Sequence, residues 1–150
     1  AAANFASITG VSSVLRFVTS SDFRAPEVVV PPNRLPPPGT GAIVGDGRDE
    51  GRRVAVSDLG GGRYVAFVPL CTSGRCRLLW KESPSATPQP SSYYECYCDL
   101  SRFSIDGCRF DGPASRNLDR YESALNDRGA LVVQTAVVIR GAIGEGVVPA

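Results

Sequence analysis

The chain has no histidine and no methionine, and Lys81 is the only lysine among its sixteen basic residues. Because histidine is the commonest general base, its absence excludes a Ser–His–Asp triad and a histidine-activated cysteine nucleophile. Schiff-base chemistry is restricted to Lys81. The lack of methionine even at position 1 indicates a lost leader, excision from a longer chain, or simple removal of an initiator methionine before Ala1.

A long apolar run and a strong net charge are also missing. No segment approaches the roughly 20 apolar residues that cross a bilayer, so no membrane span is predicted. The first residues lack the charged start and the continuous apolar stretch of a signal peptide. A net charge of +1 does not supply the basic field that attracts nucleic acid or an anionic membrane. We therefore do not expect this domain to bind nucleic acid.

What the sequence does have is an ordinary globular composition and one pronounced β-strand pattern. Its 150 residues, 43% of them hydrophobic, suffice for a single domain with a core of its own. Residues 130–139 (ALVVQTAVVI) form the longest run rich in β-branched residues. Alternate residues point to opposite faces of a strand, and both faces are largely apolar here. The pattern predicts a strand covered on both sides, in the middle of a sheet or at a subunit contact.

Further strand patterns occur along the chain, at residues 14–18, 27–30, 53–57, 63–70, 75–80, 93–98 and 102–105. The third, fourth and fifth of these are joined by glycine-containing turns, and they predict an antiparallel three-strand meander. One helix is predicted near 117–126, because Leu118, Tyr121 and Leu125 recur with helical spacing and Gly129 can end the helix.

Together these patterns predict an all-β fold, mainly an antiparallel β-sandwich that is jelly-roll-like or a partly closed barrel, with the one short helix. Residues 1–150 are expected to form a single β-rich domain. Three segments are assigned to connections: a Pro-rich crossover at 31–41, a Ser/Pro loop at 83–92 and a C-terminal tail at 141–150. The Pro-rich segment could instead be a PxxP-type ligand, but a stiff crossover is the preferred interpretation.

Five cysteines occupy positions 71, 76, 96, 98 and 108. Two disulfides with one free thiol, a Cys₄ zinc site, and buried free thiols are the competing interpretations. The spacing is a poor match to the paired knuckles of structural zinc sites, and the odd number favours free thiols. Cys71 and Cys76 flank a four-residue turn and would face each other across a hairpin, so this pair is the disulfide to test first.

The sequence contains no arrangement that identifies an active site. The segment GDGRDEG, 45–51, matches neither an EF-hand loop nor a dinucleotide-binding fingerprint, and we interpret it as a solvated turn. A pair of carboxylates could run a glycosidase-type mechanism. No spacing singles out a pair among the available acids, which are Asp58, Asp99, Asp106, Asp111, Asp119 and Glu122. We therefore predict a non-catalytic protein without a cofactor or a metal site.

The closing segment 129–140 (GALVVQTAVVIR) resembles the last strand of plant-virus coat jelly rolls. With 122–127 (ESALND) ahead of it, the same segment is similar to the end of MATH/TRAF-type peptide-binding sandwiches. The arginine-rich arm of many coat proteins and the tryptophan-containing central strand of the MATH family have no counterpart here. No functional residue is carried over, and both resemblances imply a β-sandwich that works by surface contact.

Three functions follow as hypotheses. The extended proline- and glycine-rich segments, the missing catalytic base and the near-zero net charge favour a structural or assembly module that contacts neighbouring protein chains in a larger complex or shell. A peptide- or protein-binding adaptor is the second hypothesis, and a carboxylate-dependent hydrolase is the third. The predicted contact residues are Tyr93, Tyr94, Tyr97, Pro36, Pro37, Val147 and Val148. For the tyrosines, ordinary strand packing is the preferred alternative.

Overall fold

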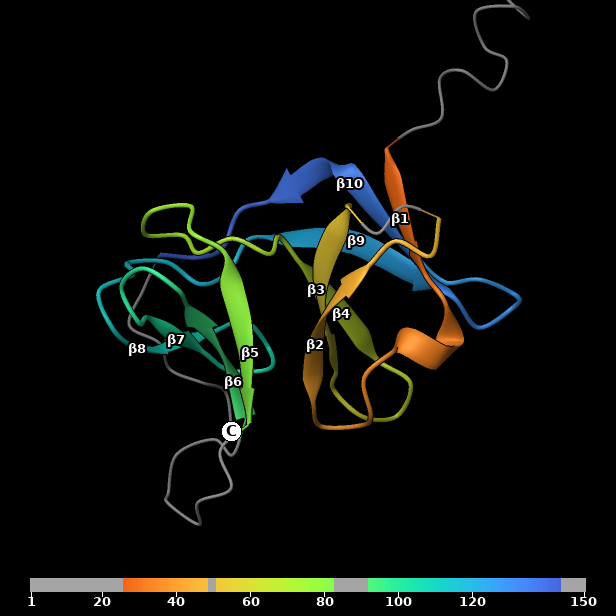
Figure 1. Ribbon diagram of the computed structural model, residues 1–150, viewed down its shortest axis with the longest axis horizontal. Helices are drawn as coiled ribbons and strands as arrows, with labels where there is room; N and C mark the ends of the chain where they lie inside the picture. Colours follow the sequence, from red (N-terminus) through yellow and green to blue (C-terminus); the bar gives the residue numbers. More distant parts are fainter. Residues whose placement is uncertain (1–25, 49–50, 83–91, 144–150) are drawn as a thin grey trace, which may run out of the picture.

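The structure is a computed structural model that describes residues 26–48, 51–82 and 92–143. These residues form two antiparallel sheets, which lie beside each other in Figure 1. The six-stranded sheet consists, in spatial order, of β1 (Glu27–Val30), β10 (Leu131–Ile139), β9 (Arg120–Leu125), β4 (Tyr64–Phe67), β3 (Arg53–Asp58) and β2 (Gly41–Gly45). The four-stranded sheet consists of β5 (Leu78–Glu82), β6 (Ser92–Cys96), β7 (Arg102–Phe103) and β8 (Arg109–Asp111). The predicted all-β fold is confirmed.

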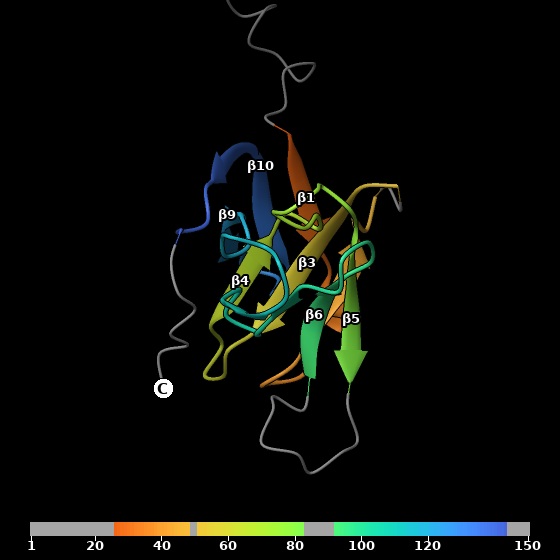
Figure 2. The ribbon, with the colours of Figure 1, turned by 90° about the vertical axis from the view of Figure 1, so that its left-hand side faces the viewer.

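Strand β3 connects two apolar clusters, because both of its faces are buried. Val54 and Val56 belong to a cluster that β3 shares with β1, β4 and β10 of the same sheet. Ala55, which lies between them, belongs to a second cluster, where β3 and β4 pack against β5, β6 and β7. Figure 2 looks onto the four-stranded sheet, with β3 and β4 behind it. The alternation of side chains along β3 thus gives each face of the strand its own core.

Strand β10 forms as predicted, but only its first half is buried. It lies between β1 and β9, and Leu131 and Val133 contribute to the core. After Gln134 the pairing with β9 is irregular and resumes at Val138. Val137 and Val138 are 62% and 51% exposed. The prediction that both faces are covered is wrong for the second half, because this nine-residue strand extends beyond the part of the sheet that faces the core.

The helix predicted near 117–126 is wrong, because β9 occupies most of that segment and pairs with β4 and β10. The turn that follows explains the difference. The side-chain oxygen of Asn126 accepts hydrogen bonds from the backbone N–H groups of Arg128 and Ala130, at 2.9 and 3.0 Å. Gly129 has a φ of +76° and completes this hairpin turn instead of ending a helix. Pairing with strands on both sides outweighs the helical spacing of three apolar residues.

The Pro-rich segment at 31–41 follows β1, includes a short 3-10 helix, η2 (Pro32–Arg34), and ends at the first residue of β2. Strands β3 and β4 form the first hairpin of the predicted meander. The third strand of that meander, β5, joins the other sheet instead, because β9 pairs with the remaining side of β4.

Three predicted segments lie wholly or partly outside the described residues. The strand at 14–18 lies outside them entirely. Of the Ser/Pro loop at 83–92, only Ser92 is described, as the first residue of β6. Of the tail at 141–150, residues 141–143 are described, and Ile143 forms a bridge with Arg116. In the described part of the chain, no helix is long and apolar enough to cross a membrane.

Gly41, at the start of β2, has no room for a side chain. A Cβ atom at this position would lie 2.4 Å from the hydroxyl oxygen of Tyr94 and 2.8 Å from the ring of Trp80. We expect Gly41→Ala to lower the free energy of unfolding by about 2 kcal/mol, a usual cost of overpacking. Urea denaturation followed by circular dichroism measures the change. Gly74→Ala is the matched control, because nothing lies within 4 Å of its Cβ position, and an equal loss in both variants would contradict the prediction.

Candidate binding groove

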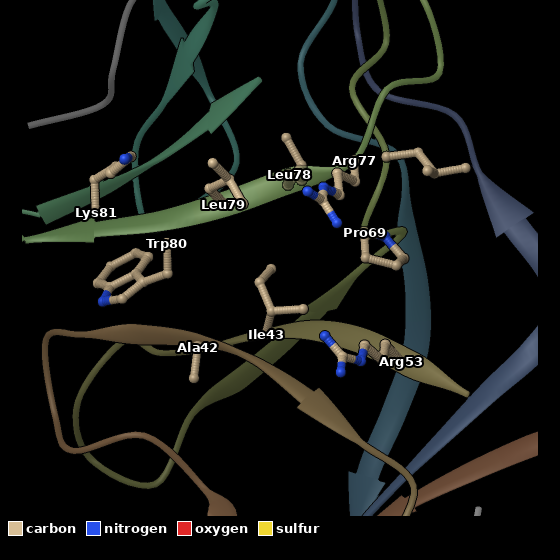
Figure 3. A pocket seen from close by; sticks show the side chains of 10 residues that line it. Ala42, Ile43, Arg53, Pro69, Arg77, Leu78, Leu79, Trp80 and Lys81 are labelled. Carbon is tan, nitrogen blue, oxygen red and sulfur yellow. The ribbon is translucent and has the colours of Figure 1, made fainter. Parts of the chain in front are cut away.

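A groove lies between the two sheets where β2 and β5 approach each other, as Figure 3 shows. Its volume is about 540 Å³, within the range of about 300–1,000 Å³ that is usual for ligand sites. Each of the two strands is the edge of its own sheet, and one side of each has no partner strand among the described residues. The lining residues are Ala42, Ile43, Arg53, Pro69, Leu70, Arg77, Leu78, Leu79, Trp80 and Lys81.

Trp80 is the largest apolar side chain in the lining, and the core beneath it restricts its position. Its ring packs edge-on against Tyr94, with the centroids 4.9 Å apart, and its indole N–H donates a hydrogen bond to the carboxylate of Glu82 at 3.3 Å. Leu79 and Ile43 are half-buried in the lining nearby. Packing on a buried aromatic ring makes this a preformed apolar surface rather than a chance gap.

The charged residues that line the groove are all basic, and the carboxylate of Glu82 lies beside it, against Trp80. Arg53 and Arg77 lie on opposite sides of it, and Lys81 lies farther along β5 (Figure 3). The guanidinium of Arg77 sits over the ring of Tyr97, 5.0 Å from its centroid. Neither Arg53 nor Lys81 forms an ion pair with any described residue. Three cations and no acidic residue in the lining produce a positive potential over an apolar surface, which favours an anionic ligand.

Tyr94, a predicted contact residue, is a core residue instead. It is fully buried, its hydroxyl donates to the carbonyl oxygen of Val56 at 2.9 Å, and its oxygen lies 2.7 Å from that of Ser57. Burial raises the pKa of Tyr94 well above its usual value. A phenol can be buried in this way because its hydroxyl keeps hydrogen-bond partners. Its assignment to an interface is therefore wrong.

The other two tyrosines are more accessible but do not share one environment. Tyr97 is 60% exposed and stands at the rim of the groove through its contact with Arg77. Tyr93 is half-buried, and its ring packs edge-on against Phe110 at a centroid distance of 5.9 Å. Among the three predicted tyrosines, Tyr97 is therefore the exposed one that contacts a residue of the groove lining.

Among the remaining predicted contact residues, Pro37 is exposed, whereas Pro36 is buried and is not available to a partner. Val147 and Val148 lie outside the described residues. Sequence reasoning missed the groove itself. The segment RLLWK, 77–81, could have indicated it, because the only tryptophan of the chain follows two leucines there and a basic residue stands at each end.

The structure joins Cys76 to Cys98, and not to Cys71 as predicted. The pairing of β5 with β6 sets Leu78 opposite Cys96, and continuing it by two residues brings Cys76 opposite Cys98. Cys71 is also a neighbour, since its backbone N–H donates to the carbonyl oxygen of Cys76 at 2.6 Å. The side chain of Cys71 is buried in the core, however. A turn in the sequence shows which cysteines are close, but not which side chains face each other.

Cys71, Cys96 and Cys108 are free thiols. Burial raises the pKa of Cys96 to about 11, and its hydrogen bond with Cys71 acts in the same direction. Burial, together with the nearby carboxylate of Asp106, also raises the pKa of Cys108. Because the thiolate is the nucleophile, these two groups are poorly suited to covalent chemistry at neutral pH.

The acids considered as catalytic candidates include residues with clear structural contacts. Asp58 accepts a hydrogen bond from the backbone N–H of Gly60 at 2.7 Å, within the β3–β4 turn. Asp119 accepts one from the guanidinium of Arg116 at 2.7 Å and another from the backbone N–H of Gly141 at 2.8 Å. The carboxylate of Asp58 therefore stabilises the β3–β4 turn, and that of Asp119 holds the chain after β10.

Three carboxyl groups with a lowered pKa, those of Asp46, Asp99 and Asp119, make the stability depend on pH. Burial alone would raise the pKa of Asp46, but hydrogen bonds from the side chain and backbone of Arg48 outweigh burial and hold it below the usual value. The pKa of Asp119 is lowered in the same way, mainly by Arg116. Such groups stabilise the fold above their unfolded pKa of about 3.9, and this contribution disappears as the pH falls through the lower folded value.

We therefore expect the free energy of unfolding to decrease as the pH falls below about 4. Urea denaturation across a pH series measures this dependence. Asp46→Asn should be less stable than the wild type near neutral pH and should lose less stability on acidification. An unchanged pH dependence in Asp46→Asn would show that Arg48 and Asp46 do not interact as described.

Comparison with known proteins does not place the chain in a family. No protein-family model matches it, and no curated protein is similar in sequence. The function is therefore argued from the groove and its surroundings.

Proposed function

We propose that the protein is a non-catalytic subunit of a larger assembly, and that its groove between β2 and β5 holds an extended segment of a neighbouring protein chain. The observation that carries the proposal is an apolar groove between two sheet edges with three cationic side chains in its lining. The carboxylate-dependent hydrolase is not proposed, because candidate acids such as Asp58 and Asp119 serve local contacts.

The two edge strands supply the backbone part of this recognition. An edge strand carries N–H and C=O groups that a further strand can pair with, and strand addition is a recurring mode of peptide binding. Strand β5 has five residues, so an added segment of similar length would span about 17 Å. Main-chain pairing of this kind provides affinity without strict dependence on the sequence of the partner.

The side chains of the lining define the chemistry of the partner. Alternate residues of a bound strand would point toward Trp80 and Ile43, which favour apolar side chains. Arg53 and Lys81 favour carboxylates elsewhere along the segment. The expected partner is therefore an extended segment in which apolar residues alternate with acidic ones.

Exposed apolar side chains near the end of β10 support the part of the proposal that concerns assembly. Val137, Val138 and Ile143, in and just after β10, are 62%, 51% and 76% exposed. Large apolar side chains exposed at the surface can mark a protein contact. The small net charge does not oppose association of many copies.

Trp80 makes the groove directly testable, because it is the only tryptophan of the chain and its fluorescence reports on the groove alone. The probe is a synthetic decapeptide in which valine alternates with glutamate, and the same peptide with lysine in place of glutamate is its control. We expect a saturable change in Trp80 fluorescence with the glutamate peptide and a much weaker one with the lysine peptide. No change with the glutamate peptide would reject the proposed groove.

A mutation that reverses the charge of a lining residue is the counterpart of the change of charge in the peptide. Arg53→Glu should weaken binding of the glutamate peptide about tenfold, since one attraction becomes a repulsion. Arg63→Glu is the control, because Arg63 is exposed in the β3–β4 turn and does not line the groove. Equal weakening by both variants would mean that only the overall charge matters, and would contradict binding in the groove.

The contact through β10 is tested by sedimentation velocity over a range of protein concentrations. We expect the wild type to associate and Val138→Asp to associate less, because the carboxylate would have to be buried in the contact. A wild type that stays monomeric throughout would contradict this contact.

A further inference from the structure

Two buried thiols and a carboxylate meet on the side of the four-stranded sheet where the turn at 71–76 packs against the turn at 96–101. The Sγ atoms of Cys71 and Cys96 and a carboxylate oxygen of Asp99 all lie within 4.8 Å of one another. Cys71 is 2% exposed and Cys96 is fully buried. None of these three residues lines the groove between β2 and β5.

Both turns are held in place by backbone contacts. In the second turn, the N–H of Cys96 donates to the carbonyl oxygen of Ser101 at 2.8 Å, and the N–H of Leu100 donates to that of Cys96 at 3.1 Å. Arg75 in the first turn and Leu100 in the second have φ values of 56° and 62°. They are the two non-glycine residues with a positive φ in the described chain. Both strained positions adjoin the cluster, which is where functional sites concentrate such conformations.

Further polar groups orient the carboxylate toward the thiols. One oxygen of Asp99 accepts a hydrogen bond from the backbone N–H of Ser101 at 2.9 Å. The hydroxyl of Ser73 donates to the other oxygen, and the same hydroxyl lies 2.8 Å from the Sγ of Cys71. Partners of this kind, which hold a ligand without binding the ion, are a regular feature of metal sites.

We propose that Cys71, Cys96 and Asp99 form a binding site for a zinc ion. Two sulfur ligands select a borderline-soft cation over Ca²⁺ or Mg²⁺, and a carboxylate is a usual third ligand. Zn–S bonds of about 2.3 Å in a tetrahedral site place two sulfurs about 3.8 Å apart. The separations here, all within 4.8 Å, are compatible with that geometry. Three protein ligands leave the fourth position to water, and the two thiols release their protons when the ion binds.

Packing in the apolar core accounts for the burial of the thiols but not for their polar partners. Cys71 and Cys96 belong to the second apolar cluster. Their sulfur atoms also lie close to the carboxylate of Asp99, and that of Cys71 contacts the hydroxyl of Ser73. The disulfide joins Cys76 to Cys98 and leaves the thiols of Cys71 and Cys96 free. Zinc binding therefore does not require reduction of the disulfide.

Cobalt is the probe for this site, because its spectrum reports on sulfur ligation. The full chain, with the Cys76–Cys98 disulfide intact and three thiols counted after unfolding, is titrated with Co²⁺ without oxygen. We expect one equivalent to produce a thiolate-to-cobalt band in the near ultraviolet and strong visible bands of tetrahedral cobalt. One equivalent of Zn²⁺ should abolish both sets of bands and raise the midpoint of thermal unfolding.

Variants separate the cluster from adventitious binding. Cys71→Ser and Asp99→Asn should each weaken Zn²⁺ binding by at least about tenfold, while Cys108→Ser, the matched control thiol, should bind as the wild type does. Circular dichroism shows whether each variant is folded. If Cys71→Ser does not fold, Asp99→Asn alone still tests the proposal. Absence of the cobalt bands would overturn the proposal. Zn²⁺ binding by Cys71→Ser and Asp99→Asn that is as tight as that of the wild type would overturn it too. So would a wild-type mass two hydrogens below that of the chain with the Cys76–Cys98 disulfide alone, because it would indicate a second disulfide between Cys71 and Cys96.

Discussion

Replacing Tyr94 with alanine is expected to lower the free energy of unfolding by about 4 kcal/mol. The ring is fully buried between the two sheets and packs edge-on against Phe67 and Trp80, with centroid distances of 6.0 and 4.9 Å. Its removal would leave a cavity at the contact between the sheets and deprive the hydroxyl of Ser57 of its partner. The loss of apolar contact and the unpaired polar group therefore act together.

Tyr94→Phe separates the contribution of the hydroxyl from that of the ring. It should cost about 1–2 kcal/mol, because Ser57 and the carbonyl oxygen of Val56 lose a buried hydrogen-bond partner. Ser57→Ala should cost a similar amount. The double variant should cost less than the sum of the two, because the two hydroxyls contact each other. Additive effects in this cycle would contradict the hydrogen bond between them.

Urea denaturation followed by far-ultraviolet circular dichroism measures all of these variants. Fluorescence is unsuitable here, since Trp80 touches Tyr94. Tyr97→Ala is the matched control, because Tyr97 is 60% exposed and its main side-chain contact is with the guanidinium of Arg77. We expect it to cost less than about 1 kcal/mol. If Tyr97→Ala cost as much as Tyr94→Ala, the positions of the two rings would be wrong.

Loss of the disulfide between Cys76 and Cys98 is expected to cost about 3 kcal/mol. The bond joins residues 22 apart in sequence, and a closed loop of this length restricts the unfolded chain by about that free energy. The double variant Cys76→Ser, Cys98→Ser should therefore have a much lower denaturation midpoint than the wild type. Guanidinium denaturation with and without a reductant measures the effect.

The reductant supplies an internal control for this prediction. It should lower the midpoint of the wild type and of Cys108→Ser, which keeps the bond, but leave that of the double variant unchanged. Peptide mapping of the unreduced protein should recover Cys76 linked to Cys98. Recovery of Cys71 linked to Cys76 would restore the pairing predicted from the sequence and contradict the structure.

The fold class could be predicted because its signals are local. Runs of β-branched residues that alternate between two faces become β3 and β10, and the three glycines at 60–62, all with positive φ, form the turn between β3 and β4. The Pro-rich crossover at 31–41 is equally local, since proline restricts its own backbone. Each of these features depends on residues a few positions apart.

The errors arose where distant residues decide between two local possibilities. Residues 117–126 carry a helical spacing, yet β4 and β10 are both positioned to pair with them as β9. Cys76 lies close to two other cysteines, Cys71 and Cys98. Only the register between β5 and β6 makes Cys98 its disulfide partner. Burial also depends on distant residues. Each face of β3 is covered by a different apolar cluster, whereas the second half of β10 extends beyond the cluster that its first half contributes to.

By itself, the sequence determined an all-β chain without the residues for histidine-dependent chemistry, since composition and alternation need no knowledge of the fold. Only the tertiary structure decided which residues form the groove and which surround the two thiols. The groove requires β2 and β5, which belong to different sheets, and the thiol cluster requires two turns about twenty-five residues apart. Such sites depend on register and on the packing of one sheet against another, which are properties of the folded chain as a whole.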